Sequence, residues 1–280
     1  MKRVLAAVLI AAALLASCKN ASFYSVLGNK AQITADVNYV SSSLTVTSGA
    51  SSAPGGAMTG GFTLTNSGAD NGTQYVTWQA YASTTAAITG SSALISSGSI
   101  APLEAGGSTH VTVTGSWPFA YGTYYLVVRS SVPVDTNTSN NLPFSSAGVT
   151  SVGIYSTTEP NDSTAGANVL GVTFQPGMSI KVTGSLTTTD LNDYLKLGAG
   201  TGTSTITFNL TWGSTALTQT ITMWVYDSTG ASVTGLYTSN NTYLIMSWTV
   251  GTYAGTNFYI SPQLTGSPGT GTYTLIITAN

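Results

Sequence analysis

Carboxylates are scarce in this 280-residue chain and unevenly placed. Four of the nine Asp and Glu residues fall in one short span, at Glu159, Asp162, Asp190 and Asp193. Carboxylate oxygens are the ligands that Ca²⁺ prefers, and a cation would relieve the repulsion among acids gathered at one end of a sheet. The alternative is structural, with Asp190 and Asp193 capping a turn and Glu159 solvated.

Other groups that could do chemistry are few. The single histidine, His110, lies between Thr109 and Val111 on the polar side of an alternating segment, which indicates a solvent-facing strand residue. Without a second histidine, hydrolase triads and the familiar zinc sites lack their parts. The sequence contains neither a G-x-S-x-G elbow nor an H-E-x-x-H motif. We therefore predict no catalytic residues.

An apolar segment begins the chain. Lys2 and Arg3 form a short positive region, and residues 4–16 are an unbroken apolar run. This run is too short to cross a bilayer, which takes about 20 residues. Its length and flanks are typical of the central region of a secretory signal.

The only cysteine follows directly after this run. Leu15-Ala16-Ser17-Cys18 resembles the lipobox of bacterial lipoproteins. The resemblance implies a signal peptide at 1–17, a covalent lipid on Cys18 and a tether over 18–33. The lipid would make the membrane a partner, because several acyl chains together anchor a protein stably. An aspartate after the cysteine would suggest inner-membrane retention, whereas Lys19 is compatible with the outer membrane. We expect a lipid-anchored protein of the cell envelope, on the surface or the periplasmic face of the outer membrane.

The composition favours an all-β protein. Charged residues make up 6 % of the chain, far below the roughly 25 % of an average soluble protein. Disorder is nevertheless not expected, because aromatic and β-branched residues are abundant enough to bury a core. The net charge is −2 and no basic stripe is present, which argues against a nucleic-acid partner.

Residues 34–149 show a period of two, as half-buried strands do. Apolar residues alternate with threonine in the segments 44–47, 62–65 and 111–114. Clusters of Gly, Asn and Asp separate such segments and indicate turns. Short strands at regular spacing predict a β-sandwich.

Four segments of this module carry a family resemblance. They are TLTNSG at 63–68, IAPLEAG at 100–106, GTYYL at 122–126 and the D…NN ending at 135–141. Together they resemble CARDB, an immunoglobulin-like domain of bacterial surface proteins linked to cell adhesion. Thr138 and Ser139 stand where the family often has acidic residues, which weakens a metal site at that place.

The strands of the second module, 159–280, have clearer faces. The predicted inward residues are Ile206, Phe208, Leu210, Trp212, Leu244, Met246, Trp248, Val250, Tyr273, Leu275 and Ile277. If Met223 and Val225 also point inward, then Trp224 and Tyr226 lie on the outer face, where large aromatics are less expected. The opposite register remains open, because both faces of that segment are partly apolar.

This module resembles the bacterial pre-peptidase C-terminal domain, a jelly-roll-like unit often attached to secreted peptidases. The matching segments are 159–162, 179–185, 190–194, 225–230 and 271–275. Related collagen-binding domains hold calcium with an E-P-N-D segment and a D-x-x-D turn. The resemblance implies calcium ligands at Glu159, Asn161, Asp162, Asp190 and Asp193. One further ligand is missing, because Thr157 replaces an acidic residue that is frequent there.

The sequence thus predicts an all-β fold of two β-sandwich domains after a lipoprotein signal peptide. The first, 34–149, is immunoglobulin-like, and the second, 159–280, is jelly-roll-like. Residues 150–158 are a linker or a connecting strand.

We expect a non-catalytic envelope lipoprotein with an adhesive, binding or structural role toward an extracellular protein or glycan. The alternative is a carbohydrate- or protein-binding accessory module that serves a partner enzyme, with Trp224 and Tyr226 as a stacking platform. A hydrolase is disfavoured, because the signal, the tether and the two modules leave no room for a peptidase domain.

Overall fold

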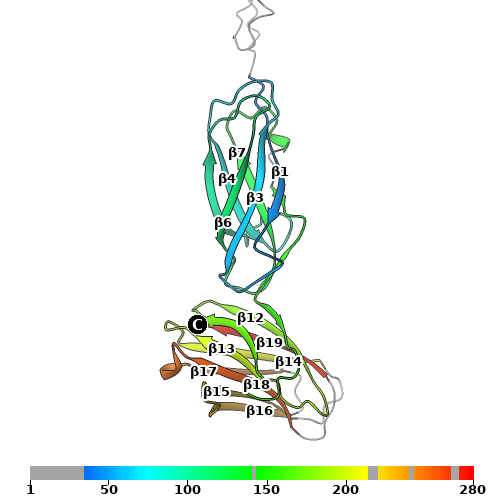
Figure 1. The fold of residues 1–280 in the computed structure, drawn as a ribbon, viewed down its shortest axis with the longest axis vertical. Helices are drawn as coiled ribbons and strands as arrows, with labels where there is room; N and C mark the ends of the chain where they lie inside the picture. The colour runs from blue at the N-terminus through cyan, green and yellow to red at the C-terminus, as the bar shows by residue number, and fades with distance from the viewer. Residues whose placement is uncertain (1–34, 141–142, 214–219, 240–242, 266–270) are drawn as a thin grey trace, which may run out of the picture.

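The computed structural model describes residues 35–140, 143–213, 220–239, 243–265 and 271–280. Within these ranges the chain forms strands, two short 3₁₀ turns and no α-helix, so the predicted all-β class is confirmed. The strands build two β-sandwiches that follow one another along the chain (Figure 1). The predicted signal peptide, the tether and Cys18 lie outside the described residues. None of the described residues belongs to a helix long and apolar enough to cross a membrane.

The first sandwich packs a three-stranded sheet against a six-stranded one. The smaller sheet has the order β1-β3-β6, and the larger has the order β2-β9-β7-β4-β5, with β8 also paired to β7. The 3₁₀ turn η1 (Thr138–Asn140) precedes β8. The strands are β1 (Tyr39–Val46), β2 (Ser51–Ser52), β3 (Ala57–Asn66), β4 (Val76–Ser83), β5 (Ala93–Ile100), β6 (Ser108–Ser116), β7 (Gly122–Ser131), β8 (Phe144–Ser145) and β9 (Thr150–Val152).

Alternation gives β4 and β6 one buried face each. In β6, Val111 and Val113 are buried whereas His110 is exposed, as predicted. In β4, Trp78 points inward and meets Phe62 of the facing sheet edge-to-face, with ring centroids 5.9 Å apart. An aromatic contact therefore joins the two sheets across the core.

The second sandwich consists of two five-stranded sheets, β10-β12-β19-β14-β17 and β11-β13-β18-β15-β16. In each sheet one pair is parallel, β10 with β12 and β11 with β13, and the other pairs are antiparallel. A second 3₁₀ turn, η2 (Gly251–Tyr253), follows β17. The strands are β10 (Ile154–Ser156), β11 (Asn168–Phe174), β12 (Ser179–Leu186), β13 (Leu195–Ala199), β14 (Thr205–Trp212), β15 (Thr220–Asp227), β16 (Ser232–Ser239), β17 (Tyr243–Thr249), β18 (Asn257–Thr265) and β19 (Gly271–Ala279).

The predicted inward faces of β14, β17 and β19 are confirmed, because every residue assigned to them is buried. In β15, Met223 and Val225 are fully buried, whereas Trp224 and Tyr226 are partly exposed. The register that places these two aromatics on the outer face is therefore the one that the chain adopts.

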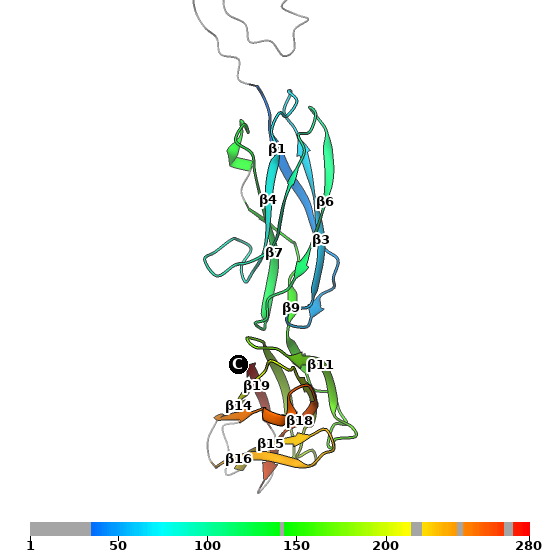
Figure 2. The same ribbon diagram turned by 90° about the vertical axis from the view of Figure 1, so that its left-hand side faces the viewer.

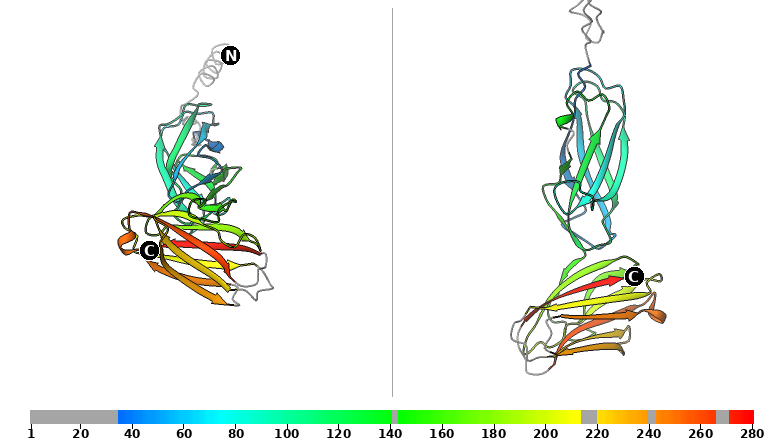
Figure 3. Two further views of the ribbon diagram at one scale, coloured as in Figure 1. Left: turned by 60° about the horizontal axis from the view of Figure 1, so that its bottom comes forward. Right: turned by 180° about the vertical axis from the view of Figure 1, so that it is seen from behind.

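A single residue connects the strands of the two sandwiches, which also meet through a hydrogen bond from the N–H of Ser179 to Phe119 O at 3.0 Å. β9 pairs within the first sandwich and β10 within the second, and only Gly153, with φ of +61°, lies between them. That backbone region favours glycine. The N–H of Gly153 donates to Ser52 O at 2.9 Å, and the N–H of Lys181 donates to Gly153 O at 2.8 Å. The segment expected as a linker or connecting strand thus contributes a short strand to each sandwich, and the sandwiches lie end to end (Figures 2 and 3).

Candidate metal centre

Two connections of the second sandwich lie against each other. One is the segment 157–167 between β10 and β11, and the other is the segment 187–194 between β12 and β13. Because β10 runs parallel to β12 and β11 parallel to β13, both connections join the same two sheet edges. The N–H of Tyr194 donates to Asn161 O, and the N–H of Asn168 donates to Tyr194 O, each at 2.9 Å. These bonds hold the two connections together.

Three of the predicted ligands converge at this place. Glu159, Asp162 and Asp190 each offer one carboxylate oxygen, and the three oxygens lie within 4.8 Å of one another. Glu159 and Asp162 are exposed, and Asp190 is half-buried. Oxygens that share one calcium ion at about 2.3–2.6 Å lie at most about 5 Å apart. The cluster could therefore hold a metal ion, and its all-oxygen donor set fits a hard cation.

Asn161 holds the segment 157–167 in its conformation through hydrogen bonds. Its side chain is fully buried, and its amide nitrogen donates to Asn168 Oδ1 at 3.3 Å. Its backbone N–H donates to Glu159 Oε2 at 3.0 Å, which orients that carboxylate. Asn168 in turn donates to Thr158 O at 2.8 Å. The amides thus build the turn that presents the acids.

Asp193 lies behind the three clustered carboxylates, turned into the sandwich. It is fully buried, and the hydroxyl of Tyr273 donates to its Oδ2 at 2.5 Å. Burial raises the pKa of Asp193 to about 6, although hydrogen bonds from Tyr273 and Thr157 oppose the rise. Burial and the neighbouring Asp193 carboxylate raise the pKa of Tyr273 well above its ordinary value. Thr157 therefore supplies a hydroxyl to Asp193 at the position where an acidic residue was expected from the family resemblance.

Asp190 has the least favourable environment for a charge. Its Oδ1 is buried without a hydrogen-bond partner among the described residues. Burial raises its pKa to about 7, assisted by a hydrogen bond with Asp162 and by the negative charges of Asp193, Glu159 and Asp162. Burial and like charges both disfavour ionisation. A bound cation would reverse this balance, because it would favour the ionised form of every carboxylate that touches it.

The aromatic residues expected on the outer face form a separate cluster. The ring of Tyr226 lies 5.5 Å from that of Tyr194 and 6.5 Å from that of Trp224, measured between centroids. Gln263 Nε2 donates to the Tyr226 hydroxyl at 3.1 Å. Trp224 packs over Gly235 of β16, where a Cβ would come within 2.5 Å of the indole. The surface therefore combines three rings with an amide, and Tyr194 belongs to the same connection as Asp190.

Sequence reasoning missed Tyr194 and Gln263 as members of the aromatic cluster, and it identified Thr157 only as the place of a missing acidic ligand. Tyr194 directly follows the D-x-x-D turn, so its place in the chain gave some signal. Gln263 reaches the aromatic cluster only through the pairing of β15 with β18, which a single sequence does not reveal. Tyr273 was expected only as a core residue, and its hydroxyl contact with Asp193 depends on the same kind of long-range pairing.

No protein-family model matches the chain, and no curated protein is similar to it. Similar solved structures include the CARDB domain of the PF1109 protein from Pyrococcus furiosus in complex with di-metal ions, with 13 % identity, 42 % of this chain and 94 % of that chain covered, and a TM-score of 0.31. They also include a β-glucosidase from Listeria innocua in complex with glucose. The two chains are 16 % identical, the match covers 49 % of this chain and 20 % of the β-glucosidase, and the TM-score is 0.29. A third is β-glucosidase 3B from Thermotoga neapolitana, which is 17 % identical. The match covers 39 % of this chain and 16 % of the β-glucosidase, and the TM-score is 0.26.

The chain thus spans a fifth or less of the β-glucosidases that it matches. The CARDB resemblance seen in the sequence has a counterpart among the similar structures, whereas the pre-peptidase C-terminal resemblance has none among those named here. Likeness at these TM-scores carries nothing about function.

Proposed function

We propose that the chain is a non-catalytic lipoprotein of the cell envelope whose second sandwich is a calcium-stabilised binding module. The observation that carries the proposal is the convergence of Glu159, Asp162 and Asp190 on one point. Carboxylates so close together repel one another unless a cation or protons neutralise them. Such a group offers several oxygen ligands to a metal ion.

Calcium is favoured over other divalent cations by the ligand chemistry. The cluster supplies carboxylates only, without the histidine or cysteine that zinc prefers. Two of the three acids are exposed and lie on turns, an arrangement that suits the flexible six- to eight-fold coordination of Ca²⁺ better than the strict octahedron of Mg²⁺. Water would complete the coordination on the exposed side.

A calcium titration of the full chain tests this proposal. We expect 1 mM calcium to raise the melting temperature of the second sandwich above its value in EDTA, because a ligand that binds only the folded state stabilises it. Asp190→Asn should abolish most of the shift, and Asp70→Asn in the first sandwich is the matched control. An equal shift in both variants, or none in the wild type, would overturn the calcium site.

Anchoring at the envelope is tested separately. With the lipid on Cys18, the wild type should fractionate with membranes and the Cys18→Ala variant should be released. Protease treatment of intact cells then distinguishes the two faces of the outer membrane. Shaving of the wild type would support an adhesive role at the surface, and protection would favour an architectural role in the periplasm.

The aromatic cluster favours a second candidate function, a glycan- or protein-binding module that serves a partner enzyme. Trp224, Tyr226 and Tyr194 offer partly exposed rings on one sheet face, and aromatic rings pack against apolar faces of ligands. Retention on insoluble polysaccharides should fall in Trp224→Ala and stay unchanged in Tyr243→Ala, which removes an exposed aromatic from the other sheet. Equal retention of both variants would remove this candidate.

A further inference from the structure

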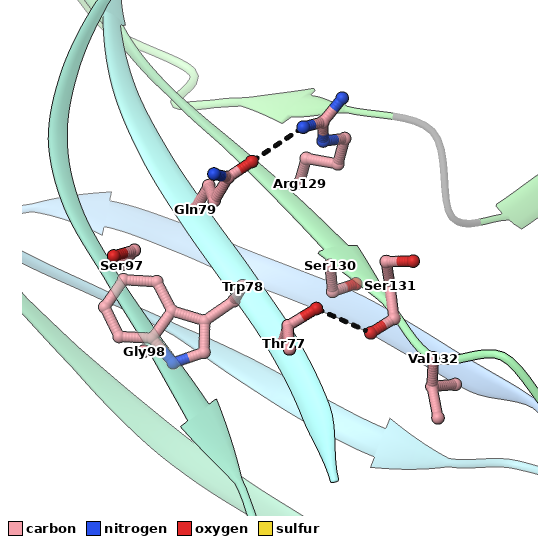
Figure 4. Close-up of a pocket in the computed structure, with 9 residues that line it drawn as sticks. All are labelled: Thr77, Trp78, Gln79, Ser97, Gly98, Arg129, Ser130, Ser131 and Val132. Carbon is pink, nitrogen blue, oxygen red and sulfur yellow. Dashed lines mark hydrogen bonds between the residues drawn. The ribbon is translucent and has the colours of Figure 1, made fainter.

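The outer face of the larger sheet in the first sandwich carries a row of three polar side chains. Ser97 of β5, Gln79 of β4 and Arg129 of β7 stand opposite one another in the strand register. The next row along the strands is Ser99, Thr77 and Ser131, and all of its members are exposed hydroxyl residues. Figure 4 shows Gln79 and Arg129 directed toward each other above the strands.

A hollow of about 690 Å³ lies at these rows. Binding sites for small molecules typically have volumes of roughly 300–1,000 Å³, so the space suits one or two sugar-sized rings. On the same side of the sandwich, the turn that contains η1 and the β4–β5 connection project from the sheet (Figure 2). The hollow is lined by Thr77, Trp78, Gln79, Ser97, Gly98, Arg129, Ser130, Ser131 and Val132, of which Trp78, Ser130 and Val132 have buried side chains.

Arg129 is held in place by a neutral partner. Its Nη2 donates to Gln79 Oε1 at 2.6 Å, and the hydroxyl of Tyr81 donates to the same oxygen at 3.0 Å. The amide oxygen is thus fixed from two sides and positions the guanidinium. Within the part of the chain that the structure describes, Arg129 has no ion pair with a carboxylate.

A guanidinium held this way is suited to an anionic ligand. Arginine carries five N–H donors in a planar fork that matches the oxygens of a carboxylate or a sulfate. One nitrogen is engaged by Gln79, and among the described residues the other donors have no carboxylate partner. The chain has two arginines, Arg3 and Arg129, and a net charge of −2. Attraction of an anion to this face is therefore a local property of the site.

The surroundings of Arg129 select among anions. On one side lies the hydroxyl row, which can exchange hydrogen bonds with a polyhydroxylated ligand. On the other side lie Tyr81 and Leu94, of which Leu94 is 55 % exposed. A pyranose ring with an acidic substituent offers matching groups, namely an oxyanion, hydroxyls and an apolar ring face. An acidic peptide would leave the hydroxyl row with fewer partners.

We propose that this hollow binds a saccharide that carries an oxyanion, either the carboxylate of a uronate or a sulfate ester. The guanidinium of Arg129 receives the oxyanion, and the hydroxyls of Ser97, Thr77 and Ser131 meet the ring substituents. The proposal stands independently of the calcium site, which belongs to the other sandwich.

The test is a titration of the purified full chain with oligogalacturonate, sulfated dextran and neutral dextran, followed by calorimetry and by amide NMR shifts. We expect binding of one or both anionic glycans, shifts centred on β4 and β7, and no binding of neutral dextran. The two anionic glycans separate a carboxylate ligand from a sulfate ligand. Arg129→Ala should weaken binding at least about tenfold, the size expected for a lost hydrogen bond to a charged group.

Three variants sharpen the result. Gln79→Glu should weaken binding as strongly as Arg129→Ala, because the new carboxylate would pair with the guanidinium. Arg129→Lys should recover only part of the affinity, because it keeps the charge and loses the fork. Lys181→Ala is the matched control, since it removes one positive charge from the second sandwich and should leave binding unchanged.

Several outcomes would overturn the proposal. One is equal weakening by Lys181→Ala and Arg129→Ala, which would indicate general electrostatic attraction. Another is binding of polyglutamate as tight as that of the glycans, which would make the ligand an acidic peptide. A third is the absence of binding by both anionic glycans at millimolar concentration. Unchanged melting temperatures of all variants would show that these results do not arise from unfolding.

Discussion

The two sandwiches use the same residue type in opposite ways. In the first, carboxylates accept hydrogen bonds from the backbone. Asp135 accepts from the N–H of Tyr39 at 3.2 Å and from that of Asn137 at 2.9 Å, and Asp70 accepts from the N–H of Asp36 at 2.8 Å. Each of these acids ties the start of β1 to a distant segment. Their role is to stabilise the first sandwich.

In the second sandwich, Asp227 accepts backbone N–H bonds in the same way, but the acids of the metal centre face one another. Glu159, Asp162 and Asp190 place their oxygens within 4.8 Å, and the pKa of Asp190 rises to about 7. The contrast shows that the number of acids in a region says little about their role. Their partners decide it, because backbone donors stabilise the charge and other carboxylates oppose it. Only the second arrangement gains from a cation.

The largest expected effect tests the structural side of this comparison. Asp135→Ala should lower the free energy of unfolding of the first sandwich by about 1–3 kcal/mol, because two N–H donors lose their acceptor near the core. Urea denaturation in EDTA and in calcium should give the same loss, since no metal is involved. A loss that calcium reverses would show that the acids of the two sandwiches do not differ in kind.

The second prediction is a gain in stability rather than a loss. In EDTA at pH 8, Asp190→Asn should raise the melting temperature of the second sandwich by a few degrees, because it removes a charge that burial and its neighbours disfavour. The measurement is differential scanning calorimetry of the wild type and the variant. A lower melting temperature would mean that Asp190 makes a stabilising contact as an anion, as Asp135 does.

The third prediction is that the stability of the two sandwiches depends differently on pH. The pKa values of Asp190 and Asp193 are raised to about 7 and about 6, so the folded state holds these protons more tightly than the unfolded state. The resulting stability is full below about pH 4, the ordinary pKa of the two acids, and is lost as the pH rises through about 6 and 7.

In EDTA, the second sandwich should therefore melt at a lower temperature at pH 8 than at pH 5. Calcium should reverse this trend, because deprotonated ligands bind the metal better. Melting curves across this range check both statements, with Asp190→Asn as the variant in which the slope becomes smaller. A second sandwich with no change between pH 5 and pH 8 in EDTA would contradict the proposed crowding of acids.

The sequence predicted the buried faces of the strands better than the contacts between side chains that are distant in the chain. Alternation was sufficient for the inward sets of β14, β17 and β19, because a period of two follows directly from strand geometry. It also identified the acids, since so few are present. It left the partners of each acid unknown, because Tyr273 approaches Asp193 only through the pairing of β12 with β19. The role of Arg129 has the same origin, since Gln79 is its neighbour across β4 and β7.

The smallest expected effect concerns Asp162. It distinguishes the contribution of burial to the pKa of Asp190 from that of the neighbouring carboxylates. Asp162 is exposed, so Asp162→Asn should change stability little. It should nevertheless lower the pKa of Asp190, because it removes a negative charge that contributes to the rise. Burial is the larger cause, so the pKa of Asp190 should remain above its ordinary value. Carboxyl NMR titration measures this directly, and a pKa that falls fully to the ordinary value would show that the acids, and not burial, control the site.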